Sequence, residues 1–310
     1  KEGYVITFLF RRILWGIPVL FFVATVTFIL MRAVPGGPFD KDKVLPPEIK
    51  ANIEAKYHLN EPLVTQYLRY MGGLVRGDLG PSYKYLSRTV NDILADSFPV
   101  SLTLGLLALA FSLGLGLPAG ILSAAIRTGW TEGSFLFLTT LGISVPTFVL
   151  GSLLVLGFSM ALFLLPPALW EGWRYAVLPV ITLGILPASY IARYTRTSCL
   201  DVLSKEFILS ARAKGVGERA VILRHVLKNS LTSVVSITGP IAAGLVSGSF
   251  LVEYIFSIPG MGKHFVQAVS NRDYPLIMGT TLVYTILIVA ANILVDVAYG
   301  LLDPRVREKQ

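Results

Sequence analysis

Few side chains in this sequence of 310 residues have types and spacings that could do chemistry. Asn292 and Asp296 lie four residues apart in an apolar run, so a helix would place them on one face. An ionisable group at membrane depth is by default a functional hypothesis, and here it suggests proton transfer. A proton relay needs partners that the other apolar runs do not supply. Because Asp303, Arg305 and Arg307 follow within a few turns, we favour a structural pairing role for Asp296.

Residues that commonly form metal or nucleophile sites are scattered. His58, His225 and His264 do not have the spacing of metal ligands, and Cys199 has no second cysteine with which to form a disulfide. The sequence contains neither a nucleophile elbow nor a Gly-rich phosphate loop. An intramembrane enzyme would need a catalytic pair at one depth in two spans, and we find none. These observations argue against a catalytic or metal centre.

The segment from Leu203 to Leu231 is the most informative part of the sequence. Ser204 can cap the N-terminus of a short helix, and Glu206 falls in its first turn. Lys214 falls in the last turn, and Gly215 follows as a C-terminal cap. Local signals therefore predict a helix of about two turns with a defined end.

One face of this short helix is predicted to be compact. Spacings of three and four residues bring together Phe207, Ser210, Ala211 and Lys214. Small residues in the middle of a face let another surface come close, so the face is typical of a docking element. A second amphipathic stretch, 218–229, leads back towards the next apolar run. The alternative is an ordinary basic loop that only sets topology, and the residues alone leave both interpretations open.

The composition predicts a membrane protein. Apolar residues make up 54% of the sequence and charged residues 15%, with a mean hydropathy of +0.66. The net charge is +8, from 27 basic against 19 acidic residues, which is typical either of a nucleic-acid partner or of the cytoplasmic face of a membrane. Since no basic stripe alternates with exposed aromatics, we expect no nucleic-acid partner.

Six apolar stretches are long enough to cross a bilayer as helices. They cover approximately residues 10–31, 100–126, 134–163, 175–195, 233–255 and 277–301. None alternates strictly between apolar and polar residues, so membrane-barrel strands are excluded. We expect an all-α integral membrane protein with one transmembrane domain, 1–310, in which Pro146 and Pro179 bend their spans. The first run reads as a retained span because its 19 residues, 13–31, exceed the apolar core of a signal peptide.

The basic residues predict the orientation. Segment 193–232 carries eight Lys and Arg against three acids, whereas 32–96 carries nine basic and eight acidic residues. Because basic loops stay in the cytoplasm, both termini and a loop at 196–232 are expected there, with an external segment at 32–98. We expect a helix over 48–59 in that segment. Arg193 and Arg196, at the end of the fourth span, are expected to anchor at the interface or to pair with an acid.

Eight fragments resemble one protein family in order and spacing. They are PGGP (35–38), GDLGPS (77–82), ARYTRTS (192–198), SARAKG (210–215), RHVLKN (224–229), FSIPGMG (256–262), NRDYP (271–275) and NILVDVAYGLLDPRVR (292–307). The sequence is thereby identified as resembling the membrane subunits of binding-protein-dependent ABC importers, in the dipeptide and oligopeptide permease branch. The short external segment and 239–253 look most like the B-type subunit of oligopeptide permeases. The resemblance implies a type I importer fold.

The resemblance also assigns a role to the cytoplasmic loop. In this family the corresponding helix couples the permease to a separate ATPase. The resemblance implies that Ser210, Ala211 and Gly215 are the second, third and seventh positions of the coupling motif. The leading Glu of the motif is replaced by Leu209, and a Pro usual after the motif is Ser233 here. The coupling residues expected from the loop are Glu206, Phe207, Ser210, Ala211, Ala213, Lys214 and Gly215.

The resemblance implies a complex of several chains in a bacterial or archaeal cytoplasmic membrane. The partners would be a similar second permease subunit, two ABC ATPase subunits that bind ATP and Mg, an external peptide-binding protein, and membrane lipid. This chain would hold no cofactor, would be no enzyme, and would form half of a path for oligopeptides or dipeptides by alternating access. The competing hypothesis is a secondary transporter driven by protons through Asp296.

Overall fold

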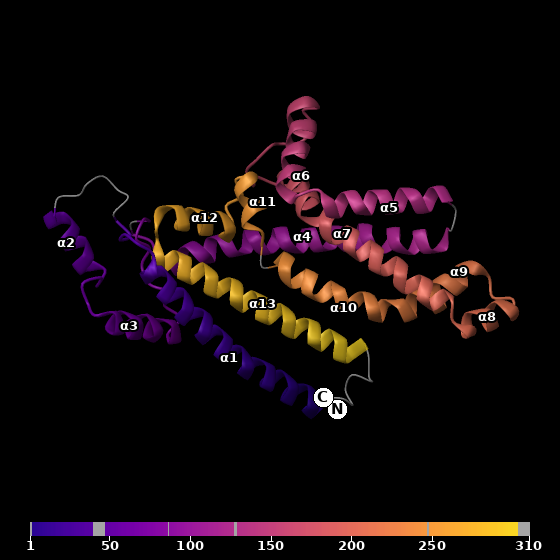
Figure 1. Cartoon of the computed structure of the whole chain (residues 1–310), viewed down its shortest axis with the longest axis horizontal. Coiled ribbons are helices and arrows are strands. Elements are labelled where there is room, and N and C mark those ends of the chain that lie inside the picture. The colour runs from indigo at the N-terminus through magenta and orange to yellow at the C-terminus, as the bar shows by residue number, and fades with distance from the viewer. Residues whose placement is uncertain (1, 40–46, 86, 127–128, 247, 303–310) are drawn as a thin grey trace.

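The computed structural model describes residues 2–39, 47–85, 87–126, 129–246 and 248–302. In this part of the chain, the regular structure is helical except for one isolated bridge between Pro81 and Thr89, which confirms the all-α class. Figure 1 shows an elongated bundle. We call the end that carries α2, α3 and α12 the cap end, and the end that carries α8 and α9 the loop end.

The helices follow one another with short connections. In chain order they are α1 (Glu2–Ala33), α2 (Pro47–Lys56), α3 (Leu63–Val75), α4 (Val90–Ala125), α5 (Gly129–Ser144), α6 (Thr147–Leu154), the π-helix η1 (Val155–Ala161), α7 (Trp173–Leu203), α8 (Glu206–Ala213), α9 (Glu218–Ala220), the π-helix η2 (Val221–Val226), α10 (Leu227–Val246), α11 (Phe250–Ile255), α12 (Met261–Asn271) and α13 (Tyr274–Leu302).

Helices occupy all six predicted apolar stretches, but not every stretch is one helix. Among the described residues, four helices are long and apolar enough to cross a membrane, namely Phe10–Ala33, Val90–Ala125, Trp173–Leu203 and Tyr274–Leu294. A bent pair of helices supplies a fifth span if the pair is counted as one, and α10 contains a shorter apolar helix, Val234–Leu245. The count of six spans and the orientation of the bundle stay predictions.

The third apolar stretch, 134–163, contains the bend that the sequence predicts at Pro146, but the helix is interrupted there. α5 ends at Ser144, and α6 begins at Thr147 after a bend of 103°. Pro146 causes the break, because it lacks an N–H and disfavours helical geometry at Val145. The expected bend is thus an interruption, and in Figure 1 the α6 segment projects from the bundle. Pro179, by contrast, lies inside the continuous helix α7.

The fifth apolar stretch, 233–255, is divided between two helices and is not one. α10 begins before Ser233, runs through it and ends at Val246. Gly248 then has φ of +89°, a left-handed geometry that suits glycine and stops the helix. The side chain of Ser249 caps the separate short helix α11. An apolar stretch reports only hydrophobicity, so it could not reveal this turn.

Two further boundaries differ from those predicted, and one helix was missed. α4 begins at Val90 rather than near 100, because Thr89 and Asp92 form a reciprocal capping box. α7 continues to Leu203, eight residues into the predicted cytoplasmic loop. The helix expected over 48–59 is present as α2, whereas α3 was not predicted.

The contact between α4 and α7 forms the centre of the bundle. Gly116 and Gly120 of α4 are buried, and a Cβ added there would lie 2.7 Å from the Ala188 carbonyl oxygen and 2.5 Å from that of Ala192. The Ser112 hydroxyl donates a hydrogen bond of 2.9 Å to the carbonyl of Gly184 across the same contact. Small residues let the two backbones touch, as is typical of helix packing in membranes. α10 packs on both helices, and α13 lies between α10 and α1 (Figure 1).

The α4–α7 contact predicts a matched pair of glycine substitutions. Gly120→Ala should destabilise the protein by about 1–3 kcal/mol, because the new methyl group meets the α7 backbone. Gly114 lies on the same helix with no atom within 4 Å of an added Cβ, so Gly114→Ala should be neutral or slightly stabilising. Thermal unfolding in mild detergent measures both, and equal melting temperatures for the two variants would contradict the packing described.

Candidate functional site

The short helix predicted in the basic loop is present as α8, at the loop end of the bundle (Figure 1). Its N-cap is Lys205 rather than Ser204, so that part of the prediction is wrong. Ser204 ends α7 in helical geometry, with φ of −82° and ψ of −7°, and its hydroxyl donates to the carbonyl of Asp201 at 2.8 Å. An N-cap needs an extended backbone, which Lys205 has.

The predicted C-terminal cap of α8 is confirmed. Gly215 has φ of +80°, the left-handed geometry that glycine adopts without steric cost. Its N–H donates to the carbonyl of Arg212 at 2.9 Å, and the N–H of Val216 donates to Ala211 at 3.2 Å. These two bonds form a Schellman motif, which gives α8 a defined end. Lys214 is the C-cap residue, just beyond the last turn.

The inner face of α8 anchors it to the bundle. Ile208 is fully buried and Ala211 is 9% exposed. Ile208 joins a buried cluster that we call the anchor cluster, whose other members are Ala124 of α4, Cys199 and Leu203 of α7, and Val221 and Val226 of η2. The predicted face of four residues was therefore partly wrong, because Ala211 points inwards. Ile208 was missed, although its spacing of three from Ala211 was a signal of a buried face.

The outer face of α8 is open. Phe207 is 45% and Leu209 61% exposed, so two large apolar side chains stand on the surface. The remaining expected coupling residues are also exposed, namely Glu206, Ser210, Ala213, Lys214 and Gly215. Leu209, which replaces the leading Glu of the motif, was not among the expected residues. We call Glu206, Phe207, Leu209, Ser210, Ala213 and Lys214 the outer face.

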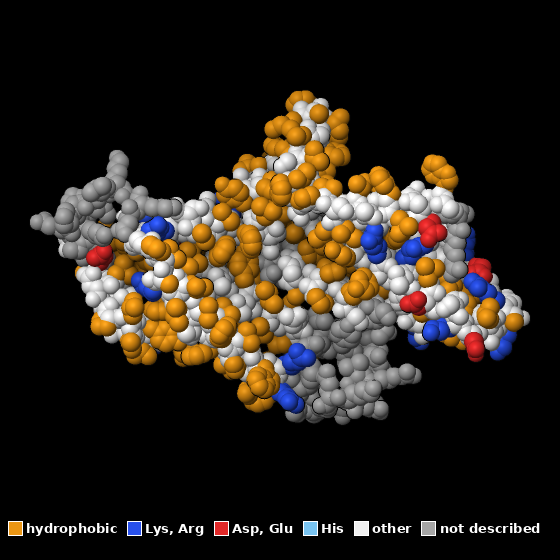
Figure 2. Space-filling view, viewed as in Figure 1, with side chains coloured by type: hydrophobic (Ala, Val, Ile, Leu, Met, Phe, Trp, Pro, Cys, Tyr) orange, Lys and Arg blue, Asp and Glu red, His pale blue; other side chains and the backbone are white. Residues whose placement is uncertain are grey.

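Charges surround this outer face, as the blue and red side chains at the loop end in Figure 2 show. Arg212 pairs with Glu218, with Nε 2.8 Å from Oε1, and so joins α8 to α9 across the turn. Both side chains are exposed, so the pair contributes little stability but limits the geometry of the turn. The arrangement is suited to binding a protein surface, and no group of three possible metal ligands occurs among the described residues.

Two arginines of α7 tie that helix to α5, and one of them, Arg196, pairs with an acid, which was one of the two roles expected for them. Arg196 forms an ion pair with Glu132 and lies over the Phe135 ring, 5.6 Å from its centroid. Arg193 donates to the hydroxyls of Thr139 at 3.1 Å and Thr140 at 2.5 Å. Both therefore hold the bundle together near the loop end. On α13 Asn292 is exposed, whereas the side chain of Asp296 lies outside the described residues.

At the cap end, three segments that are far apart in sequence meet. The Asp273 carboxylate is buried and accepts hydrogen bonds from the Ser82 hydroxyl and, at 3.1 Å, from the Tyr83 N–H. The Tyr274 hydroxyl donates to the carbonyl of Gly36 at 3.1 Å. Three of the sequence fragments, PGGP, GDLGPS and NRDYP, are thus brought into one cluster, which sequence spacing could not reveal.

A buried carboxylate holds the segment between α11 and α12. Glu253 is fully buried, and its Oε2 accepts from the Gly262 N–H at 2.7 Å. The Ser101 hydroxyl of α4 accepts from the Met261 N–H at 2.9 Å. Gly260, the N-cap of α12, has no side chain and no room for one, so these two groups replace its cap. Sequence analysis missed Glu253, because the predicted fifth span included it.

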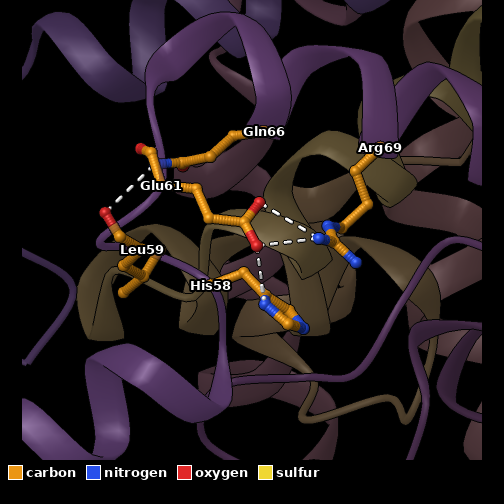
Figure 3. A network of polar contacts seen from close by, with 5 residues as sticks. All are labelled: His58, Leu59, Glu61, Gln66 and Arg69. Carbon is orange, nitrogen blue, oxygen red and sulfur yellow. Dashed lines mark hydrogen bonds and ion pairs between the residues drawn. The ribbon is translucent and has the colours of Figure 1, made fainter.

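The loop between α2 and α3 carries a polar network, drawn in Figure 3. The Glu61 carboxylate lies 2.8 Å from Arg69 and 3.0 Å from His58. Gln66 donates to the carbonyls of Leu59 and Glu61, at 3.0 and 2.7 Å. Side chains of α3 therefore fix the connection to α2.

Two described protein families match this chain. Residues 116–308 match the family described as the binding-protein-dependent transport system inner membrane component. Residues 5–105 match its N-terminal family. Together the two matches include α7, the whole of α8 and the cap-end segments, and they leave residues 106–115 of α4 between them.

Named relatives match over almost the whole chain. The dipeptide transport system permease protein DppB of Bacillus subtilis is 42% identical over 92% of this chain and 92% of its own length. The oligopeptide transport system permease proteins OppB of Haemophilus influenzae and of Escherichia coli are each 42% identical, over 97% of this chain and 99% of their own lengths. The same identity is found with dipeptide and oligopeptide relatives, so it identifies the type of subunit rather than one substrate.

Solved structures share the fold at lower identity. A chain of the MetNI methionine ABC transporter, in an inward-facing conformation, matches with a TM-score of 0.59 and 16% identity, over 68% of this chain and 96% of that one. A chain of an amino acid ABC transporter with histidines matches with a TM-score of 0.54 and 14% identity, over 68% and 94%. With its apolar helices, the chain is a multi-pass inner membrane protein, and it belongs to the binding-protein-dependent transport system inner membrane components, as a B-type permease subunit of the dipeptide and oligopeptide branch.

Proposed function

We propose that this permease docks through α8 on a cytoplasmic ATPase and forms half of a peptide path with a second permease subunit. The ATPases bind ATP and Mg, and an external binding protein delivers the peptide. The observation that carries the proposal is that α8 has an exposed outer face directly opposite a buried anchor. An element built in this way can bind a partner on one side while it pulls on the bundle with the other.

The anchor cluster supports mechanical coupling. Ile208 of α8 packs with residues of α4, α7 and η2, and η2 continues directly into α10. A displacement of α8 would therefore reach three helices at once. Because packed interiors transmit strain instead of absorbing it, the displacement becomes a rigid-body shift of the loop end. Nucleotide binding in the ATPases would in this way bias the path between its inward and outward states.

The docking surface can be tested with the outer face of α8. The measurement is the amount of ATPase that co-purifies with the permease in mild detergent. The double variant Phe207→Ser and Leu209→Ser should bring down at least about tenfold less ATPase than the native chain. Truncation of central apolar contacts commonly costs more than 1 kcal/mol each. Ala211 is unsuitable for this test, because its side chain is buried and a substitution would disturb the fold.

A matched control exists at the other end of the bundle. Val64 and Leu68 of α3 are 70% and 64% exposed, so Val64→Ser with Leu68→Ser removes similar apolar surface away from α8. The same amount of ATPase should co-purify with this control variant as with the native chain. Equal recovery from both double variants, whether high or low, would refute docking through the outer face.

The end of α8 allows a separate test of transmission. Gly215→Ala should cost about 1–2 kcal/mol, because its φ of +80° is unfavourable for a residue with a Cβ. Asn tolerates this geometry better, so Gly215→Asn is the conservative control. In proteoliposomes that hold the complex, peptide transported per ATP hydrolysed should fall severalfold in Gly215→Ala and much less in Gly215→Asn. If Gly215→Ala transports as much peptide per ATP hydrolysed as the native chain, the rigid end of α8 is not needed for coupling.

The competing proton-driven mechanism predicts a different result at Asp296. If uptake is driven by ATP, Asp296→Asn should retain it within about twofold, because no proton passes through this group. Uptake should also survive collapse of the proton gradient. Loss of uptake in a folded Asp296→Asn variant, with ATPases present and hydrolysing ATP, would favour the proton route instead.

A further inference from the structure

A cavity of about 420 Å³ lies at the cap end, where α1, the α2–α3 segment and the start of α13 meet. Its volume falls in the range of sites for small molecules and headgroups. It lies at the cap end with the polar network of Figure 3, and His58, Gln66 and Arg69 belong to both. The outer face of α8 lies at the opposite end of the bundle (Figure 1), so the coupling proposal does not use this cavity.

Positive charge dominates the lining of the cavity. Arg32, Lys56 and Arg69 line it, and Arg69 is paired with Glu61. Neither Arg32 nor Lys56 forms an ion pair with any residue that the structure describes. The acidic side chain in the lining is Asp78, whose Oδ1 accepts from the Gly80 N–H at 2.9 Å. Two uncompensated cations against one carboxylate favour an anionic ligand.

Aromatic rings hold the two cations in place. The Arg32 guanidinium lies 5.3 Å from the centroid of the Phe28 ring and 5.8 Å from that of Tyr274. The Lys56 ammonium lies 5.7 Å from the centroid of the Tyr57 ring. Cation–π contacts orient a cation without neutralising it, so both groups keep their charge for a ligand.

The cavity also has unused hydrogen-bonding groups beside it. Within the described part of the chain, the buried Tyr70 hydroxyl and the buried Oε1 of Gln66 have no hydrogen-bond partner. Burial raises the pKa of Tyr70 to about 12, so its hydroxyl remains protonated and can donate. Unsatisfied buried polar groups are costly, and a ligand or bound water relieves the cost.

Membrane depth indicates which anion fits. The apolar span of α1, Phe10–Ala33, has 24 residues and a length of about 36 Å, slightly more than the hydrocarbon core of about 30 Å. Arg32, one residue before its end, therefore lies at the level of the lipid headgroups. This is the depth at which basic and aromatic side chains gather in membrane proteins.

α3 is built to lie along the same interface. One stripe of the helix is apolar and exposed, formed by Leu63, Val64, Leu68 and Val75. Gln66 and Tyr70 line the cavity on the other side. A helix with an apolar outer stripe and a polar inner face is typical of the membrane interface. Figure 2 shows hydrophobic side chains gathered over the α1 and α3 side of the molecule.

We propose that this cavity binds the phosphate of an anionic phospholipid headgroup. Arg32 and Lys56 contact the phosphate oxygens, and the Tyr70 hydroxyl donates a hydrogen bond. The acyl chains lie on the exposed apolar surfaces of α1 and α3. The lipid would thereby tie the α2–α3 cap to α1.

The test titrates the full chain, purified in mild detergent and delipidated, and counts bound ligand by native mass spectrometry. The probes are phosphatidylglycerol, phosphatidylcholine and glycerol 1-phosphate. Phosphatidylglycerol should bind at least about tenfold more tightly than either of the other two. Lys56→Gln should weaken it about fivefold, and Arg32→Gln with Lys56→Gln about 25-fold, since each basic residue near a lipid surface contributes about a factor of five.

Arg76→Gln is the matched control. Arg76 is exposed at the end of α3 and does not line the cavity, so this variant should bind phosphatidylglycerol like the native chain. Lys56 is exposed as well, so the single variant tests the proposal even if the Arg32 variant fails to fold. Equal binding of both phospholipids, or an equal loss in Arg76→Gln, would overturn the proposal. Binding of glycerol 1-phosphate as tightly as the lipid would also overturn it, because the cavity would then bind a soluble phosphate compound and would not need the lipid.

Discussion

Gly116 and Gly120 let the backbone of α4 touch that of α7, and the other helices are arranged around this contact. In lipid, no water competes for polar backbone groups, so helices satisfy their own hydrogen bonds and associate chiefly through packing. Dispersion falls off steeply with distance, so residues without bulky side chains give the largest gain where two helices cross. α10 packs on both α4 and α7. The anchor cluster joins α8 to α4, α7 and η2, and it contains no residue of α10.

The two ends of the bundle use different chemistry. At the loop end, Ile208 sits in an apolar cluster, and charges remain on the surface. At the cap end, two buried carboxylates, Asp273 and Glu253, accept hydrogen bonds from backbone N–H groups of distant segments. Apolar packing transmits a push in any direction, whereas hydrogen bonds to a buried carboxylate hold particular atoms at particular distances. The loop end is therefore suited to receiving movement, and the cap end to keeping irregular segments in a defined shape.

The α8 region shows how far local signals reach. Gly215 was correctly identified as a C-terminal cap, because a left-handed residue after a helix is a property of a few neighbouring residues. Ser204 was not the N-cap, because α7 continued to Leu203 and left Ser204 in helical geometry. The last turns of α7 pack in the anchor cluster with residues of α4, α8 and η2, and the local sequence does not reveal this packing. Ala211 was assigned to the docking face, and only its burial in the folded chain reveals that it points inwards.

By itself, the sequence determined the all-α membrane class, the places of the apolar segments, the short helix in the basic loop and, through eight ordered fragments, the family. These are properties of composition and of neighbouring residues, which the chain carries wherever it folds. Only the tertiary structure decided the direction of α8 and the meeting of Ser82 with Asp273. Each depends on a surface supplied by a distant segment, because a helix face is buried or exposed only in relation to what packs against it.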